Sequence, residues 1–246
     1  MAVRLPADIS ACLFDLDGVL TKTAAVHAAA WKETFDAFLR RRADADGTPF
    51  VPFDAVADYD ELVDGKPRLD GTRAFLASRG IELPEGRPDD RPGLDTVHGL
   101  SNEKNRRLLE RLRRDGVDVY PGSVTFLRAV RDQGLATAVV SSSANTLGVL
   151  KATGLEQLFD QRVDGRSAAE EHLAGKPAPD TYLAAARRLD VAPARAVVFE
   201  DALAGVEAGR AGHFGLVVGV DRVGQAAALA AHGADVVVAD LSELLG

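Results

Sequence analysis

Short apolar runs alternate with longer segments of helical periodicity along most of this chain. The runs are rich in β-branched residues, and the segments between them place apolar residues three and four positions apart, which is the spacing of one helix face. The expected strands are residues 11–14, 136–140, 161–163, 196–199, 215–220 and 236–238. Strands that alternate with helices predict right-handed crossovers, and therefore a parallel sheet with helices on both faces.

The pattern changes between residues 24 and 116, where no strand-like run occurs. Helical periodicity is clear at residues 70–78 and 101–114, where Asp70 and Ser101 are the expected N-caps. An insert without strands inside an alternating pattern indicates a second, helical domain. We therefore expect an α/β, Rossmann-like core at residues 1–23 and 117–246, interrupted by an all-α cap domain at residues 24–116.

Composition narrows the range of partners. A formal net charge of −8 and an isoelectric point near 5.2 disfavour a phosphate backbone, so we expect no nucleic acid partner. No apolar run approaches the roughly 20 residues that cross a bilayer, and the N-terminus lacks a signal-peptide pattern. The single cysteine, Cys12, lies in the first expected strand and is expected to be a buried apolar residue. We expect a cytoplasmic monomer without a membrane partner.

Two carboxylates follow the first expected strand. Asp15 and Asp17 are separated by one residue and are followed by Gly18, which favours a turn at the strand end. A single aspartate there is most simply an acidic turn. In an open parallel sheet, however, ligands bind beside the carboxyl ends of the strands, so two acids at this position can converge on a site.

Polar residues also follow other expected strands. Ser141 and Ser143 come after residues 136–140, and Glu200 with Asp201 comes after residues 196–199. Lys176 precedes an expected helix. Together these residues offer hydroxyl and ammonium donors for phosphate oxygens, and carboxylates for a hard cation such as Mg²⁺. No cluster of His or Cys indicates zinc, and no dinucleotide fingerprint occurs.

These motifs, in this order, resemble those of the haloacid dehalogenase-like superfamily of phosphotransferases across nearly the whole chain. The resemblance implies that Asp15 attacks phosphorus to form an aspartyl-phosphate, while Asp17 protonates the leaving group and later deprotonates the acceptor. It also implies that Ser141 and Lys176 hold the phosphoryl oxygens. The implied ligands of Mg²⁺ are Asp15, the carbonyl of Asp17, Asp201 and Glu200. An acid at position 17 points to phosphatase or phosphomutase chemistry within the superfamily.

Within this superfamily the chain is most similar to the β-phosphoglucomutase group, which carries a helical cap after the first motif. The resemblance implies catalytic roles for Thr23 and His27, and a small phosphorylated sugar as substrate. It also implies that Arg68 grips the phosphate that is not being transferred. The other substrate-binding residues that match are Trp31, Gly65, Lys104 and Asn105 of the cap, and Ser143 and Asn145 of the core.

Two positions depart from the pattern of that group. Asp64 and Ala144 stand where the group has lysines, although Lys66 follows two residues after Asp64. Both changes remove positive charge near the second phosphate. We therefore weigh a β-phosphoglucomutase, which converts β-glucose 1-phosphate to glucose 6-phosphate, against a sugar-phosphate phosphatase with the same site. A non-catalytic binding module is disfavoured because the core motifs are complete.

Overall fold

The computed structural model describes residues 3–246 and divides the chain into two compact units. The first unit contains the chain up to Lys22, the short segment Gly65–Pro67, and Val117–Gly246. The second unit contains Thr23–Asp64 and Arg68–Gly116. Within residues 3–246, no helix is long and apolar enough to cross a membrane.

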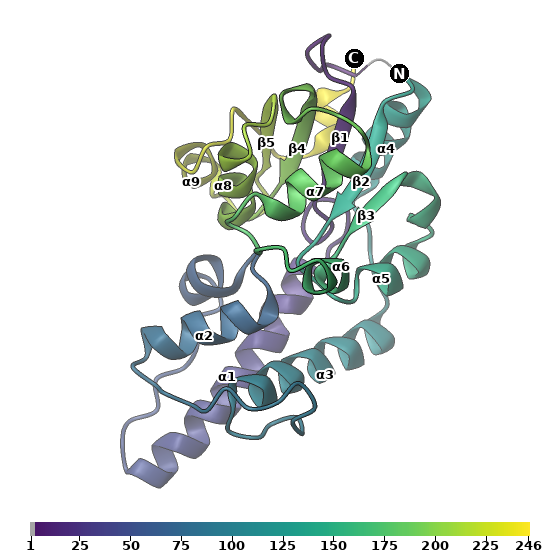
Figure 1. The fold of residues 1–246 in the computed structure, drawn as a ribbon. Helices are drawn as coiled ribbons and strands as arrows, with labels where there is room; N and C mark the ends of the chain where they lie inside the picture. Colours follow the sequence, from purple (N-terminus) through teal and green to yellow (C-terminus); the bar gives the residue numbers. More distant parts are fainter. Residues whose placement is uncertain (1–2) are drawn as a thin grey trace. The chain divides into compact units, whose positions relative to one another are not determined.

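The first unit is built on a six-stranded parallel sheet in the order β3-β2-β1-β4-β5-β6 (Figure 1). The strands are β1 (Ala11–Phe14), β2 (Ala136–Val140), β3 (Gln161–Val163), β4 (Ala196–Glu200), β5 (Leu216–Val220) and β6 (Val236–Val238). Strands β2 and β3 follow β1 on one side of the sheet, and β4, β5 and β6 follow on the other side of β1. This order places a topological switch point between β1 and β4, where open α/β sheets bind their ligands. The expected α/β fold with a parallel sheet is confirmed.

Helices connect the strands of the first unit. They are α4 (Pro121–Asp132), α5 (Thr146–Thr153), α6 (Gly165–Glu170), α7 (Asp180–Arg188), α8 (Leu203–Ala211) and α9 (Ala226–Ala231), with 3₁₀ turns at Glu156–Leu158, Pro193–Arg195 and Leu241–Leu244. The sequence pattern did not predict α6. Its N-cap is Asp164, whose side chain accepts hydrogen bonds from the backbone N–H groups of Arg166 and Ser167, both at 3.0 Å.

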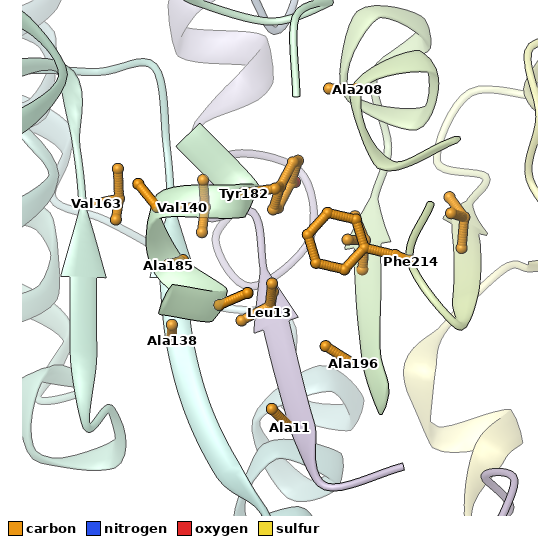
Figure 2. Close-up of a cluster of buried hydrophobic side chains, with 14 of the residues drawn as sticks. Ala11, Leu13, Ala138, Val140, Val163, Tyr182, Ala185, Ala196, Ala208 and Phe214 are labelled. Carbon is orange, nitrogen blue, oxygen red and sulfur yellow. The ribbon is translucent and has the colours of Figure 1, made fainter. Parts of the chain in front are cut away.

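Successive residues of β1 face opposite sides of the sheet, as the two-residue period of a strand requires. Leu13 packs in a cluster with Tyr182 and Ala185 of α7, where small alanines allow the helix to approach the strands closely (Figure 2). Phe14 instead contacts Phe126 of α4, with ring centroids 6.3 Å apart. Helices therefore cover both faces of the sheet, and the central strands β1 and β4 are buried on both sides.

The second unit is helical in every element the structure describes. It contains α1 (Ala24–Asp46), a π-helical turn at Tyr59–Val63, α2 (Arg68–Ser78) and α3 (Val97–Asp115). Aromatic rings form its core: Phe35 stacks on Trp31 with centroids 5.0 Å apart and on Phe75 with centroids 3.9 Å apart. These three residues are buried.

The two N-caps expected in this unit were wrong. α2 begins two residues before Asp70, which instead forms an ion pair with Arg73 (Oδ1 to Nη1, 2.7 Å). α3 begins after Thr96, whose hydroxyl accepts a hydrogen bond from the N–H of Gly99 at 2.9 Å. Ser101 lies inside α3, is fully buried, and shares a 2.8 Å hydrogen bond with the hydroxyl of Thr72. A hydroxyl that pairs two helices in a core cannot be distinguished from a cap by its type alone.

Candidate active site

The end of β1 presents Asp15 at the switch point of the sheet. The backbone N–H of Asp15 donates a hydrogen bond to the carbonyl of Phe199 at 2.9 Å, which continues the β1–β4 pairing by one residue. The carboxylate of Asp15 is buried, whereas Asp17 is partly exposed. The chain therefore turns between the two acids, so that one lies at the base of the site and the other nearer to solvent.

Gly18 allows Asp201 to approach this turn. The residue has a φ of +92°, and a Cβ built on it would lie 1.7 Å from Oδ2 of Asp201. A side chain at position 18 would thus be strained by the backbone conformation and would also displace the Asp201 carboxylate. The glycine that the sequence indicated as a turn residue is required for the close approach of β1 and β4 at their carboxyl ends.

Lys176 is buried beneath Asp15. Its ammonium donates hydrogen bonds to Oδ1 of Asp15 at 2.6 Å, to the carbonyl of Val140 at 3.2 Å, and to Oε1 of Glu200. Burial alone would lower the pKa of Lys176, but the two carboxylates outweigh it and raise that pKa well above its usual value. The lysine is therefore charged, and its charge is directed at Asp15.

Glu200 is fully buried, and both of its carboxylate oxygens accept hydrogen bonds. Oε1 accepts from Lys176 and, at 3.0 Å, from the hydroxyl of Tyr182, and Oε2 accepts from the N–H of Ala202 at 3.0 Å. Burial and the neighbouring Glu200 raise the pKa of Tyr182 well above its usual value, so its hydroxyl is a donor. Tyr182 is not predictable from the sequence as a site residue, because an aromatic residue on the apolar face of a helix carries no sign of a buried polar partner.

The loop after β2 lies next to Asp17. The hydroxyl of Ser141 donates to Oδ2 of Asp17 at 3.3 Å and accepts from the N–H of Ser143 at 3.1 Å. The hydroxyl of Ser143 accepts in turn from the N–H of Asn145 at 3.2 Å. These local bonds hold the loop in one conformation ahead of α5. The structure thus brings Ser141 together with the β1 acids and places Ser143 and Asn145 in the same loop.

Three carboxylates of this site could hold a cation. Oxygen atoms of Asp15, Glu200 and Asp201 lie within 4.8 Å of one another, and all three residues are buried. Burial raises the pKa of Asp15, and the neighbouring Glu200 and Asp17 add to this effect, although Lys176 opposes it. Carboxylate oxygens are the ligands that Mg²⁺ prefers. The residues present therefore fit a hard divalent cation.

Two donors that the sequence did not indicate support the site from the end of β5. Arg222 donates to the carbonyls of Gly18 at 2.9 Å and Val19 at 3.1 Å, and Gln225 donates to the carbonyl of Asp201 at 3.0 Å. Both residues follow a strand-like run, which is the signal that identified the other site residues. The sequence alone does not single them out, because their partners are backbone atoms that no motif records.

The second unit gathers part of its expected site residues into one cluster. The ammonium of Lys104 lies 3.0 Å from Nδ1 of His27 and 4.7 Å from the ring centroid of Trp31. Thr23 is buried at the start of α1, and its carbonyl accepts a hydrogen bond from the N–H of His27 at 2.9 Å. Both Lys104 and Trp31 are buried, so this cluster combines a cation with an aromatic surface.

The remaining expected residues lie elsewhere. Arg68 begins α2, and its Nε is buried without a hydrogen-bond partner among residues 3–246. Asn105 lines a hollow of about 360 Å³ in the second unit, together with Asn102 and Arg106. Gly65 belongs to the first unit, where its carbonyl accepts a 2.6 Å hydrogen bond from the hydroxyl of Ser142.

The fold and the site define an α/β enzyme with a buried acidic centre at the switch point of a parallel sheet and a helical insert after its first strand. The chain belongs to the haloacid dehalogenase-like hydrolase family, whose model matches residues 9–213.

Relatives of known name are similar along nearly the whole chain. The sequence is 59% identical over 244 residues to β-phosphoglucomutase of Mycobacterium bovis. This alignment covers 98% of this chain and 93% of that protein. It is 32% identical over 240 residues to β-phosphoglucomutase of Bacillus subtilis, covering 96% and 92% respectively. The crystal structure of β-phosphoglucomutase from Clostridium difficile matches with a TM-score of 0.75 at 26% identity, over 96% of this chain and 93% of that one.

Proposed function

We propose that this protein is a Mg²⁺-dependent β-phosphoglucomutase, which interconverts β-glucose 1-phosphate and glucose 6-phosphate through a bisphosphate. The observation that carries the proposal is the 59% identity to an enzyme of that name over 98% of the chain. The geometry of the first unit supports the same chemistry, because a buried carboxylate, a second carboxylate and a buried ammonium meet at the switch point of the sheet.

In this proposal Asp15 is the nucleophile. One carboxylate oxygen of Asp15 forms a bond to phosphorus while the bond between phosphorus and the sugar oxygen breaks, which leaves an aspartyl-phosphate. Asp17 donates a proton to the departing sugar oxygen. In the second half of the reaction, Asp17 takes the proton from the hydroxyl that attacks the aspartyl-phosphate, so proton and phosphoryl group are both conserved. The partial exposure of Asp17 suits a residue that must reach the sugar.

Lys176 and Ser141 are the proposed holders of the transferred phosphoryl group. Lys176 already contacts Asp15 at 2.6 Å, so its ammonium would stabilise the charge that develops on the phosphoryl oxygens. Ser141 lies 3.3 Å from Asp17 and can offer its hydroxyl to the same oxygens. Glu200 accepts a hydrogen bond from Lys176, and the hydroxyl of Tyr182 holds Glu200 in turn. These contacts keep the ammonium of Lys176 next to the nucleophile.

Asp15, the carbonyl of Asp17, Asp201 and Glu200 are the proposed surroundings of Mg²⁺. Because both oxygens of Glu200 already accept hydrogen bonds, Asp15 and Asp201 would be the direct carboxylate ligands. When bound, the cation neutralises charge on the phosphoryl group. Turnover should cease in excess chelator and return when Mg²⁺ is restored, and full activity in chelator would contradict this assignment.

The second unit is proposed to act as a cap. His27, Lys104 and Trp31 form a cationic and aromatic cluster suited to the hydroxyl groups and apolar face of a sugar. Arg68 would bind the phosphate that is not being transferred, and its buried, unpartnered Nε supports a role in binding an anion. Exclusion of water by such a cap would favour transfer to a sugar hydroxyl over hydrolysis.

The phosphatase that the sequence left open has less support, because two relatives that are 59% identical to nearly the whole chain carry the mutase name. A product assay separates the two. We expect β-glucose 1-phosphate, with a trace of β-glucose 1,6-bisphosphate and Mg²⁺, to yield glucose 6-phosphate, which a coupled dehydrogenase detects. Release of inorganic phosphate at the rate of substrate loss, without glucose 6-phosphate, would establish the phosphatase instead.

A further inference from the structure

The segment that begins α6 packs tightly against the loop after β2. Gly165 donates its N–H to the carbonyl of Ser143 at 3.1 Å. A Cβ built on Gly165 would lie 2.7 Å from the carbonyl oxygen of Ser142 and 2.9 Å from the backbone N of Ala144. Only a glycine permits this approach without displacing backbone atoms. The position of residue 166 relative to the Ser141–Asn145 loop is therefore fixed by backbone contacts.

Arg166 extends from this contact onto the loop. Its backbone N–H donates to Oδ1 of Asp164 at 3.0 Å, and its side-chain Nε donates to the carbonyl of Ala144 at 3.1 Å. Its two terminal amino groups make no hydrogen bond or ion pair within residues 3–246, and the side chain is exposed. The guanidinium is thus held at one edge on the loop while its other donors stay accessible to a ligand.

The positive charge of Lys176 in the first unit is already paired with buried carboxylates. That ammonium is held by Asp15 and Glu200, and its side chain is only 1% exposed. A sugar phosphate that presents a phosphate at each end during turnover needs cations for the second phosphate as well, since an unpaired dianion near buried carboxylates is repelled. Arg68, proposed above for that phosphate, belongs to the second unit, so the first unit needs a cation of its own for it. Ala144 lies three residues after Ser141, whose hydroxyl contacts Asp17, so the loop that holds the Arg166 side chain is the same loop that reaches the β1 acids.

We propose that Arg166 is a specificity-determining residue that binds the phosphate group of the sugar substrate that is not being transferred. This inference rests on the proposed mutase function. The free edge of the guanidinium offers paired N–H donors, which match phosphate oxygens bidentately. The loop residues that flank Ala144, namely Ser143 and Asn145, would lie beside the same phosphate.

Two substitutions of similar length test the proposal. Arg166→Met keeps an unbranched, flexible side chain and removes its charge, and Arg166→Lys keeps the charge and removes the paired donors. We expect KM for β-glucose 1-phosphate, with the bisphosphate and Mg²⁺ present, to rise at least tenfold in Arg166→Met and by a smaller factor in Arg166→Lys. Hydrolysis of p-nitrophenyl phosphate, which has no second phosphate, should stay within twofold of wild type in both variants.

Arg210→Met is the matched control. Arg210 is an exposed arginine at the end of α8, a helix that leads away from the carboxyl edge of the sheet, and its KM should not change. An unchanged KM in Arg166→Met, an equal rise in Arg166→Lys, or a parallel fall in p-nitrophenyl phosphate hydrolysis would overturn the role of Arg166. If wild type itself forms no glucose 6-phosphate, the proposed function fails, and that result is seen before any variant is compared.

Discussion

The site of the first unit holds more buried carboxylates than buried cations among the residues described. Asp15 and Glu200 are buried against the ammonium of Lys176, and Asp201 is buried beside these two carboxylates. Removing a carboxylate from water costs several kcal/mol unless a cation or hydrogen bonds compensate it. Lys176, Tyr182 and the backbone supply part of this compensation. A bound divalent cation would supply the remaining compensation of the buried negative charge.

Gly18→Ala should lose activity out of proportion to its loss of stability. The positive φ alone costs an alanine about 1–2 kcal/mol, but the new Cβ would also overlap Oδ2 of Asp201, which must move. Gly134→Ala is the control, because Gly134 has a φ of +77° and no atom lies within 4 Å of the place that an alanine Cβ would take.

Urea unfolding and the Mg²⁺ dependence of turnover would be measured for both glycine variants. We expect comparable losses of unfolding free energy, and a raised Mg²⁺ requirement in Gly18→Ala alone. Equal activity of the two variants would mean that the approach of Asp201 to Gly18 has no part in the site.

Cys12 should make stability fall at alkaline pH. Burial raises the pKa of this thiol well above its usual value, so the folded protein keeps the proton that the unfolded chain loses. Because the folded state then binds more protons, the unfolding free energy decreases as pH rises above about 9, by about 1.4 kcal/mol per pH unit. Wild type should therefore lose stability more steeply than Cys12→Ala between about pH 9 and 10.5 in urea unfolding. Parallel slopes for the two proteins would contradict the buried, protonated thiol.

Individual site residues were predictable where they follow a strand and are of a type that binds phosphate or a cation. Asp15, Ser141 and Asp201 were found in the sequence because parallel strands bring their carboxyl ends together whatever their separation along the chain. Tyr182 and Arg222 were not found, since their partners are a buried carboxylate and backbone carbonyls that only the tertiary packing brings near. Arg166 belongs to the same group, because its partner is the carbonyl of Ala144.

At the scale of elements, strands were more predictable than helix ends. The runs at Ala136–Val140, Gln161–Val163 and Val236–Val238 have the bounds that the apolar pattern predicted. The start of α3 was wrong because Ser101 and Thr96 are both acceptable caps, and the choice depends on burial of Ser101 against α2. The short α6 was missed although Asp164 and Ser167 have the spacing of a capping box.

The helices of the second unit should depend on one aromatic stack. Phe35 of α1 is fully buried and contacts the rings of Trp31, Phe53 and Phe75. Phe35→Ala should lower the unfolding free energy of this unit by about 3–5 kcal/mol, because it removes the ring and leaves a cavity. Trp31 is the single tryptophan of the chain, so its fluorescence reports on this unit alone.

An exposed residue of the same unit provides the control for this measurement. Val56 is 67% exposed, and Val56→Ala should change the unfolding free energy by less than about 0.5 kcal/mol. If urea unfolding followed by Trp31 fluorescence gave the same midpoint for Phe35→Ala and wild type, the aromatic stack would not be what holds α1 in place.

The whole molecule combines a unit that carries the carboxylates with a unit that carries a cationic and aromatic cluster. The parallel sheet followed from the alternating pattern and a chirality rule, and the insert followed from the absence of strand-like runs. What the pattern alone could not supply is the substrate, because a shared fold hosts many reactions. The family match, and the 59% identity to a β-phosphoglucomutase over 98% of the chain, narrow the range of possible substrates.

The central claim, that phosphoryl transfer passes through Asp15 to a sugar and not to water, can be tested by labelling the enzyme. Wild type and Asp15→Asn would be mixed with ³²P-labelled β-glucose 1,6-bisphosphate and Mg²⁺, quenched within milliseconds, and chased with unlabelled β-glucose 1-phosphate. We expect label on the wild-type peptide that contains Asp15, its chase into bisphosphate and glucose 6-phosphate, and none on Asp15→Asn, which should keep the wild-type melting profile. Label on a folded Asp15→Asn, or a chase into inorganic phosphate at a rate independent of the added sugar phosphate, would contradict the account.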